Sequence, residues 1–363
     1  MNGINLYTIL TIVLLFACGK TETEIPNKDN RTIRQLVNQN FNNSILIGAT
    51  IGSGSFGQPV AQILDREFSY VTPENDFKQS RIHPEPGIWN WEQADAWIDH
   101  IEENKQVLRI HGPISPQCSD WIKADDRTPE ELSQMLEEFF PALCKKYNGI
   151  PGIISMDVVN EVAINGKWHK NKSGTKWECP WYIIGQDTDK NQTPLYIKRA
   201  FEIANEFATD LKLIFNHHEK TINQASWKLI KETITYLREQ GLRVDGIGWQ
   251  SHIDVGWETK ENLQALSGLI DWAHSNDLEF HITEASVFLK SDTEEDFRNQ
   301  AKTYSEILKV VVEKRKTGVV GWNTWHVSDG VGWRQDEFPA IFDTDYQPKP
   351  AYFKIKEVLG SED

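Results

Sequence analysis

The feature that most constrains the fold is an alternation of short β-branched runs with longer segments of helical period, which continues from residue 44 onward. Strands that alternate with helices pair in parallel, and eight of them close into a (β/α)8 TIM barrel. No linker rich in Pro, Gly or Ser interrupts the pattern, so the sequence predicts an α/β fold with one catalytic domain over residues 44–363. The predicted strands are 44–51, 70–74, 107–111, 153–160, 211–216, 246–251, 279–283 and 319–325, and the predicted helices include 91–104, 129–147, 195–209, 223–240, 260–275 and 294–316.

Charge and aromatic content narrow the choice of ligand. Acidic residues outnumber basic ones by 53 to 38, and the net charge of −15 argues against a nucleic acid and repels other polyanions. The chain also has 14 Trp, some of which we expect to face a ligand, although packing is the default for any single ring. A packing role is expected for Trp89, Trp91, Trp97, Trp121, Trp227, Trp272 and Trp322.

The N-terminus resembles an export signal. An apolar run from Leu6 to Ala17 precedes Cys18, and it is too short to span a bilayer. A small residue before a cysteine is similar to a bacterial lipoprotein cleavage site, so residues 1–17 are expected to be a signal peptide, Cys18 the lipidated residue, and residues 18–43 a tether. The protein is then an exported lipoprotein at the cell surface or the periplasmic face of a membrane; plain secretion and a buried helix are the alternatives.

Besides Cys18, three cysteines remain, Cys118, Cys144 and Cys179, and this odd count excludes a full disulfide framework. Cys118 and Cys179 both fall in loops on one face of the predicted barrel, so a bridge between them and free buried thiols are both open.

Polar side chains gather where the predicted strands end. In a parallel barrel the chemistry lies at the C-terminal ends of the strands, and carboxylates placed there cost desolvation and repulsion that a purely structural barrel has little reason to bear. The residues at these ends are Glu74, Asn75, His111, Asn160, Glu161, Asn216, Gln250, His252, Glu284, Trp325, His326 and Asp329.

Two of these residues, Glu161 and Glu284, suit glycosidic bond cleavage. Each follows an apolar strand, so the two carboxylates face each other across the barrel mouth. One carboxyl group must hold a proton for the leaving oxygen, and the other must be ionised to attack or stabilise the sugar C1. Asn160 beside Glu161 suits a hydrogen bond to the sugar 2-hydroxyl. From periodicity alone, two rim glutamates in salt bridges remain an alternative.

Several motifs resemble those of the family 10 glycoside hydrolases, most of which are endo-β-1,4-xylanases. The resemblance runs in the family's order over roughly residues 44–359, which is far more specific than a single motif. It is carried by Asp157-Val158-Val159-Asn160-Glu161, Gly246-Ile247-Gly248-Trp249-Gln250-Ser251-His252, Ile282-Thr283-Glu284, Pro348-Lys349-Pro350-Ala351-Tyr352 and Glu74-Asn75-Asp76-Phe77-Lys78.

The resemblance implies roles for individual residues. Glu161 becomes the acid/base and Glu284 the nucleophile of a retaining double displacement, and His252 is placed to keep Glu284 ionised. Glu74, Asn75 and Lys78 match a polar cluster for the sugar one step beyond the cleaved residue, and His111 matches a histidine at the cleavage site; their structural alternatives are a local salt bridge and a hydrogen-bonded strand-end histidine. The other substrate-binding residues expected are Asn160, Asn216, Gln250, His252, Trp325 and Trp333.

Neither a metal nor a cofactor is expected. His217 and His218 are adjacent on a strand and therefore point to opposite faces. The partner we expect is a β-linked polysaccharide or oligosaccharide, with membrane contact only through the lipid, and the chain is expected to be a monomer.

The chain departs from the family pattern close to the sugar. The loop after residue 111 lacks the family's Trp-His pair, and Ser286 stands where an aspartate is common. Met156, His217, Trp249 and His326 are further departures. Retaining endo-β-glycoside hydrolysis is therefore the prediction, most simply of xylan; the alternatives are a retaining hydrolase of another β-linked polysaccharide and a carbohydrate-binding lipoprotein without turnover.

Overall fold

The computed structural model of the chain describes residues 29–41, 44–124, 126–170 and 178–361. Residues Arg31–Asp363 form one compact unit. Within the described residues, no helix combines the length and the apolar character that a membrane crossing needs. The expected signal peptide and Cys18 lie outside the described residues, and both stay predictions.

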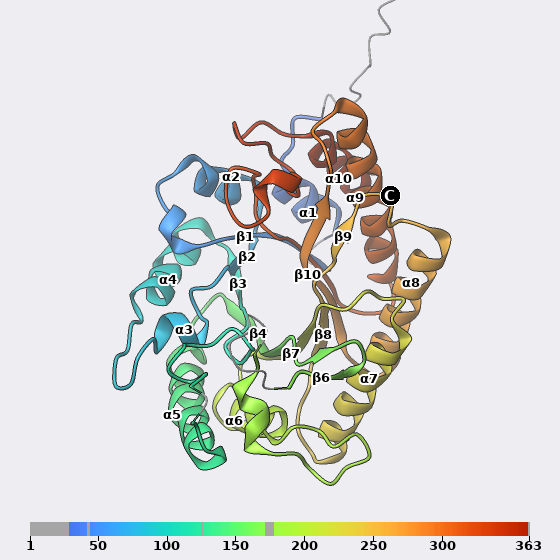
Figure 1. The fold of residues 1–363 in the computed structure, drawn as a ribbon. Helices are drawn as coiled ribbons and strands as arrows, with labels where there is room; N and C mark the ends of the chain where they lie inside the picture. The colour runs from blue at the N-terminus through green and yellow to red at the C-terminus, as the bar shows by residue number, and fades with distance from the viewer. Residues whose placement is uncertain (1–28, 42–43, 125, 171–177, 362–363) are drawn as a thin grey trace, which may run out of the picture. The chain divides into compact units, whose positions relative to one another are not determined.

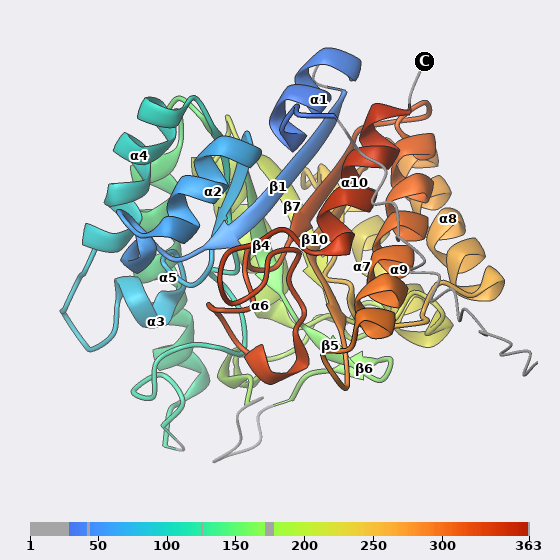
Figure 2. The same ribbon diagram turned by 90° about the horizontal axis from the view of Figure 1, so that it is seen from above.

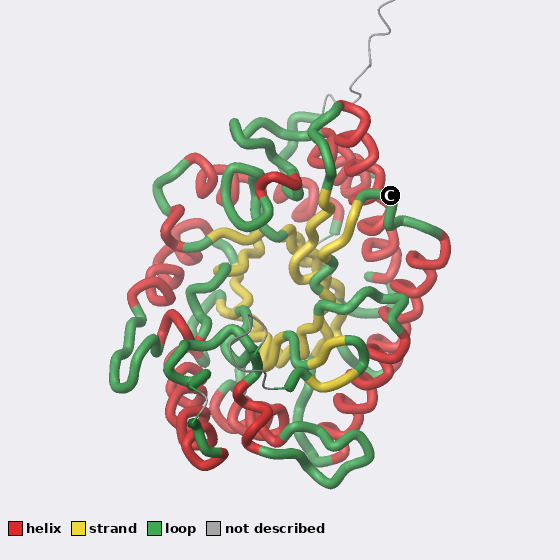
Figure 3. Tube along the Cα trace, viewed as in Figure 1, coloured by secondary structure: helices red, strands yellow, loops and turns green. Residues whose placement is uncertain are grey.

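Eight parallel strands close into a barrel, which confirms the predicted fold class (Figures 1 and 3). The sheet order is β11-β1-β2-β3-β4-β7-β8-β10, and pairing of β10 with β11 completes the ring. β11 closes the barrel because it pairs with β1 on one side and with β10 on the other: Val320 aligns with Ile45 and with Phe280. The strands are β1 Ile45–Ile51, β2 Tyr70–Pro73, β3 Val107–Ile110, β4 Ile153–Asn160, β7 Lys212–His217, β8 Gly246–Trp249, β10 Glu279–Phe288 and β11 Val320–Thr324.

Helices surround the barrel on its outer side (Figure 1). All six predicted helices are present, with ends within two residues of the predicted ones. α5 shows why the sequence gives these ends: Thr128 and Glu131 form a capping box, and Pro129 occupies the first turn, where its missing N–H costs nothing. The helices are α2 Pro59–Glu67, α3 Gln79–Ile82, α4 Glu92–Asn104, α5 Pro129–Tyr147, α6 Leu195–Phe207, α7 Gln224–Glu239, α8 Lys260–Ser275, α9 Glu294–Lys314 and α10 Pro350–Gly360.

The segment expected to be a tether contains a helix, so the predicted range 18–43 is wrong in its second half. Helix α1, Ile33–Asn40, buries Ile33, Leu36 and Val37 against the barrel end opposite the β5–β6 hairpin, with β5 Ala163–Ile164 and β6 Lys167–Trp168 (Figure 2). The Ile33 amide donates to a Glu67 carboxylate oxygen at 3.0 Å. Eight residues are too few to be helical by propensity alone, so packing decides this helix.

Strand β10 extends five residues beyond its predicted end, and this difference bears on the site. The register of β10 against β11 shifts between Ile282 and Ala285, and the outer half of β10 pairs instead with β9, His252–Asp254. Such an irregularity re-aims a side chain, here that of Glu284. Glu284 therefore stands inside a strand and not after one.

All three cysteines of the described residues are buried free thiols. The bridge that the sequence left open between Cys118 and Cys179 is absent. Both thiols have their pKa raised by burial, which keeps them protonated and unreactive.

Candidate active site

A cleft of about 630 Å³ opens at the C-terminal ends of the barrel strands. It gathers side chains from loops that are more than 250 residues apart in sequence, as barrel closure requires. The structure brings together most of the residues that the sequence singled out, and adds six others. The lining residues are Glu74, Asn75, Lys78, His111, Gln117, Glu161, Ile164, Asn165, His218, Glu219, Lys220, Gln250, His252, Glu284, Trp325 and Trp333.

Glu284 is held by partners on both carboxylate oxygens. Asn216 Nδ2 donates to Oε1 at 2.9 Å, and His252 Nε2 donates to Oε2 at 3.2 Å. The side chain is almost fully buried, and burial alone would raise its pKa. The charge of His111, the hydrogen bond and charge of His252, and the charge of Arg109 outweigh burial and lower the pKa from 4.5 to about 2. Glu284 is therefore a fixed carboxylate that stays ionised.

Ser286 completes the surroundings of His252. The other ring nitrogen of this histidine, Nδ1, lies 3.1 Å from Ser286 Oγ, and that hydroxyl also donates to the Glu284 carbonyl oxygen at 3.2 Å. A hydroxyl both donates and accepts, so it satisfies either protonation state of the imidazole. Ser286 thus orients His252 without adding a negative charge behind it.

Glu161 has a different environment. Its Oε1 accepts from Gln250 Nε2 at 2.9 Å, whereas its buried Oε2 has no partner among the described residues. β4 ends at Asn160, and Glu161 itself adopts φ +58°, a left-handed conformation that costs roughly 1–3 kcal/mol for a residue with a side chain. One oxygen is therefore fixed, and the other is available for a proton or a ligand.

A chain of amides joins the two glutamates. Asn160 Oδ1 accepts from Asn216 Nδ2 at 2.9 Å and from Gln250 Nε2 at 3.1 Å. These bonds leave the buried Asn160 Nδ2 without a partner in the described part of the chain, although it is a donor. Asn160 and Asn216 thus lie beneath the cleft lining and set the positions of the groups above them.

Gly248 leaves room for this network of amide hydrogen bonds. A Cβ at this position would lie 2.4 Å from Asn216 Oδ1 and 2.8 Å from Thr283 Cγ2. Thr283 Oγ1 in turn donates to the same Asn216 oxygen at 2.8 Å. Because no real side chain fits there, glycine is required for Asn216 to reach Glu284.

Arg109 and Asp157 form a buried ion pair beneath the cleft, and neither residue was predicted to be functional. Asp157 Oδ2 accepts from Arg109 Nη1 and, at 2.8 Å, from His111 Nδ1. Arg109 Nη2 also donates to the Thr283 carbonyl oxygen at 2.8 Å, next to Glu284. The pair therefore fixes His111 and places positive charge below Glu284. A charged residue inside an otherwise apolar strand was the available signal.

The Glu74 end of the cleft is a polar cluster. Asn75 Nδ2 donates to Glu74 Oε1 at 3.0 Å, and Lys78 Nζ donates to Gln117 Oε1. Burial raises the pKa of Glu74, against the charge of Lys78, and burial lowers the pKa of Lys78, against the charges of Glu161, Glu284 and Glu74. Gln117, in the divergent third loop, was missed because nothing in that loop marks a binding residue.

The two tryptophans expected to stack on sugar differ in exposure. Trp325 is 5% exposed and packs edge-on against His111, with ring centroids 5.1 Å apart. It therefore lies at the bottom of the cleft and offers little open surface to a ligand. Trp333 is 41% exposed and stands edge-on to His252 at 5.3 Å. Of the two, Trp333 presents the open aromatic surface.

A further part of the cleft lining comes from the β5–β6 hairpin, which contacts the loop after β7 and the start of helix α7. The Asn165 amide donates to Glu219 Oε1 at 2.6 Å, and the Gly166 amide donates to Ser226 Oγ at 2.7 Å. This docking brings Ile164 into the cleft and, from the loop, Lys220. Ile164 and Asn165 of the hairpin therefore line the cleft, whereas residues 171–177, farther along the chain, lie outside the described residues.

Three other strand-end residues are structural. His217 lies fully buried against Trp227 and does not line the cleft. Asp329 accepts from Lys349 Nζ at 2.8 Å in a buried ion pair, which also explains the lysine of the motif at 348–352. His326 is buried at φ +71° beside Trp325.

The comparisons with known proteins agree with this geometry. The model of the family described as Glycosyl hydrolase family 10 matches residues 32–358. An endo-1,4-β-xylanase A of Caldicellulosiruptor saccharolyticus is 31% identical, over 85% of this chain and 92% of that one. The native crystal structure of xylanase 10B from Thermotoga maritima has a TM-score of 0.78 at 28% identity and covers 90% of this chain and 98% of its own. Xylanase 10B from Thermotoga petrophila, crystallised with xylobiose, has a TM-score of 0.77 at 27% identity and covers 92% and 98%.

Proposed function

The chain belongs to glycosyl hydrolase family 10, and on this premise we propose that it is a retaining endo-1,4-β-xylanase that cleaves xylan by double displacement. The single observation that carries the proposal is the contrast within the cleft. One buried glutamate is fixed and ionised, and the other keeps an oxygen without a partner among the described residues. Retaining glycoside hydrolases need these two states.

Glu284 is the proposed nucleophile. Its depressed pKa keeps it charged, and the bonds from Asn216 and His252 orient it toward the anomeric carbon. Attack forms a bond from a Glu284 oxygen to C1 while the bond from C1 to the leaving oxygen breaks. The hydrogen bonds hold the carboxylate in position before the reaction, so little reorganisation is needed during it.

Glu161 is the proposed acid and then base. A proton on Oε2 passes to the leaving oxygen as the glycosidic bond breaks, while Gln250 holds Oε1. Once Glu284 is esterified its charge is gone, and Glu161, now a carboxylate, takes a proton from water. That water attacks C1 on the face that the leaving group left, so the product keeps the β configuration.

The remaining cleft residues suit the binding of a neutral sugar chain. Asn160 Nδ2 is a buried donor without a partner among the described residues, on the residue that precedes Glu161, and a sugar 2-hydroxyl is its proposed acceptor. Trp333 offers a ring for the apolar face of a pyranose. Glu74, Asn75 and Lys78 are proposed to bind the sugar next to the cleaved one.

The test is a panel of β-linked polysaccharides incubated with the purified chain. We expect new reducing ends from xylan, with long xylo-oligosaccharides appearing first, because an endo-acting enzyme cuts within the chain. Cleavage of another β-linked polysaccharide but not of xylan would show that the proposed substrate is wrong and would leave the proposed retaining mechanism in place. Binding without cleavage of any of them would overturn the proposal.

We also propose that the chain is exported and anchored by lipid at Cys18. The apolar run that ends at Ala17 supports this, and the anchor would keep the enzyme at the membrane face where polysaccharide arrives. Labelling cells with a radioactive fatty acid tests the proposal: we expect label on the wild type and none on Cys18→Ala. We propose in addition that the chain is a monomer. Light scattering on the purified protein measures its mass in solution, and the mass of one chain is expected.

A further inference from the structure

Beside the cleft, the third loop forms a second depression, which we call the Trp121 hollow. It encloses about 560 Å³ between helix α3 and the loop after β3. The residues that line it include Ser80, Glu85, Cys118, Ser119, Asp120 and Trp121. None of these six lines the cleft.

The hollow lies next to the Glu74 end of the cleft. Lys78 and Gln117 line the cleft and are joined by a hydrogen bond. Ser80 follows Lys78 by two residues, and Cys118 follows Gln117 directly, and both line the hollow. The bonded pair Lys78–Gln117 thus belongs to the cleft, and its neighbours in sequence, Ser80 and Cys118, belong to the hollow, so the two depressions lie next to each other.

Trp121 is held firmly at the edge of the hollow. Its Nε1 donates to the His83 carbonyl oxygen at 3.2 Å, and the two rings meet edge-on with centroids 5.1 Å apart. His83 in turn stacks on Trp89 at 4.2 Å. The loop is pinned as well, because the Ser119 amide donates to Gln79 Oε1 at 2.7 Å. A ring that is already ordered loses little entropy when a sugar stacks on it.

The polar groups of the hollow favour a neutral sugar. Glu85 and Asp120 are exposed, and neither carboxylate forms an ion pair within the described residues. Carboxylates accept hydrogen bonds from sugar hydroxyls and would repel a uronic acid. An aromatic ring beside such acceptors is the combination that binds a pyranose.

We propose that the Trp121 hollow is a distal subsite that binds neutral xylose residues of the substrate beyond the Glu74 end of the cleft. The inference rests on the proposed function and names a further part of the substrate-binding surface. It predicts that Trp121 matters for long substrates and not for short ones, because only a long chain reaches from the cleavage site to the hollow.

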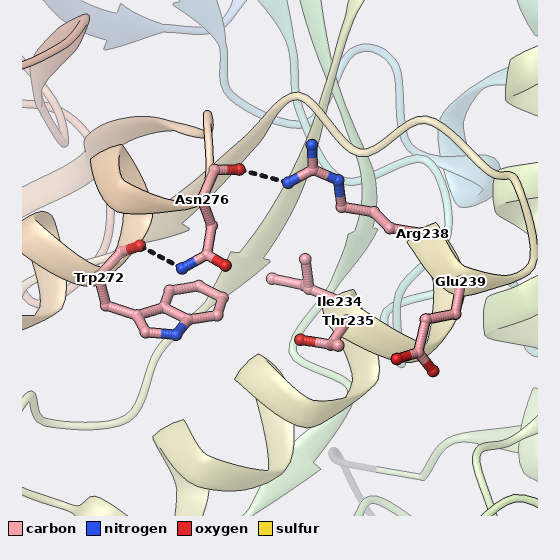
Figure 4. Close-up of a pocket in the computed structure, with 6 residues that line it drawn as sticks. All are labelled: Ile234, Thr235, Arg238, Glu239, Trp272 and Asn276. Carbon is pink, nitrogen blue, oxygen red and sulfur yellow. Dashed lines mark hydrogen bonds between the residues drawn. The ribbon is translucent and has the colours of Figure 1, made fainter.

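The chain offers a matched control in Trp272. This residue is also half-buried and lines a depression of about 290 Å³ with Ile234, Arg238 and Asn276, between helices α7 and α8 on the outer side of the barrel (Figure 4). None of these residues lines the cleft. Trp272→Ala therefore removes an indole of similar exposure at a place that a bound substrate does not reach.

The experiment compares Trp121→Ala with the wild type on an aryl xylobioside, xylohexaose and soluble xylan. We expect kcat/KM to be unchanged on the xylobioside and to fall roughly three- to tenfold on xylohexaose and xylan, the range expected for one lost aromatic contact. Trp272→Ala is expected to match the wild type on all three. Asp120→Arg, which alters an exposed side chain at the hollow, should reproduce the loss on long substrates even if Trp121→Ala folds poorly.

Two results would overturn the inference: equal kcat/KM of Asp120→Arg and wild type on xylan, or a loss of the same size on all substrates. The wild-type rate on xylohexaose tests the proposed function separately. If the wild type cleaves no xylan substrate, the proposed function fails; if it cleaves them and the ratio between variant and wild type does not change with chain length, only the distal subsite fails.

Discussion

Glu284 and Glu161 line the same cleft, yet their partners differ in number and kind. Glu284 accepts hydrogen bonds on both oxygens, one of them from an imidazole, and a buried guanidinium lies nearby. Glu161 accepts one bond from an amide, and its second, buried oxygen has no partner among the described residues. Two identical side chains thus acquire different chemistry from their surroundings: fixed charge suits attack on carbon, and an open oxygen suits proton transfer.

The largest expected effect comes from removing each carboxylate in turn. Glu284→Ala should lower kcat on xylan by roughly 10⁵-fold or more, because the nucleophile is lost. Glu161→Ala should lower it by about 10²- to 10⁴-fold, and by much less on an aryl glycoside whose leaving group needs no proton.

Azide separates the two roles by product stereochemistry, read by proton NMR. In Glu161→Ala, azide replaces water in the second displacement, so a β-glycosyl azide is expected. In Glu284→Ala, azide attacks in a single displacement, so any product is the α anomer. The reverse assignment of anomers would exchange the roles of the two glutamates.

The free energy of unfolding should depend on pH through Glu284. The pKa of Glu284 falls from 4.5 to about 2 on folding, so the carboxylate stabilises the fold fully above pH 4.5 and loses this contribution as pH falls toward 2. About 3 kcal/mol should be lost over that window, on the order of the shift. Denaturant unfolding of wild type and Glu284→Gln at several pH values measures it. A stability difference between the two proteins that is constant from pH 5 to pH 2.5 would show that folding does not perturb this pKa.

The amides that support each glutamate give a third, smaller effect. Asn216→Ala removes a donor to Glu284, and Gln250→Ala removes the donor to Glu161. Each should lower kcat roughly ten- to a hundredfold, the loss expected for a hydrogen bond to a charged group.

Their pH profiles should differ, which makes each variant the control for the other. Loss of Asn216 raises the pKa of the nucleophile, so the acid limb of kcat/KM moves to higher pH, whereas loss of Gln250 leaves that limb in place. Identical profiles for the two variants would contradict separate environments.

The smallest expected effect comes from Ser286→Asp. A carboxylate 3 Å from His252 Nδ1, where the hydroxyl now lies, would favour the protonated imidazole and strengthen its bond to Glu284. We expect the basic limb of the pH profile to extend upward and kcat at its optimum to change by less than about threefold. Ser286→Ala is the matched control and should not extend the limb; if it does, the hydroxyl and not the charge is responsible.

The barrel and much of the cleft could be predicted from the sequence because periodicity and strand-end polarity are local signals. Glu161 and Glu284 were found in this way, Lys78 was found through the family resemblance, and the structure places all three in one cleft. Helix α1 was missed because its formation depends on packing against the barrel and not on a long local pattern. The register shift in β10 depends on two neighbouring strands, and no single run of residues encodes it.

The supporting residues were harder to find than the reacting ones. Arg109 and Asp157 lie within strands and not at their ends, and only the folded barrel shows that they meet beneath Glu284. Ile164 and Lys220 reach the cleft because the β5–β6 hairpin docks on the loop after β7, a contact between loops far apart in sequence. Residues whose role depends on a partner elsewhere leave little trace in their own neighbourhood.

The central claim is that Glu284 forms the covalent bond to the sugar, and trapping that bond tests it most directly. An activated 2-deoxy-2-fluoro-xylobioside slows the second displacement, so the glycosyl-enzyme accumulates and can be digested and sequenced by mass spectrometry. We predict one labelled peptide, with the sugar on Glu284 and unmodified Glu161. Label on Glu161, or rapid turnover to an α-configured product without a trapped intermediate, would contradict the assignment.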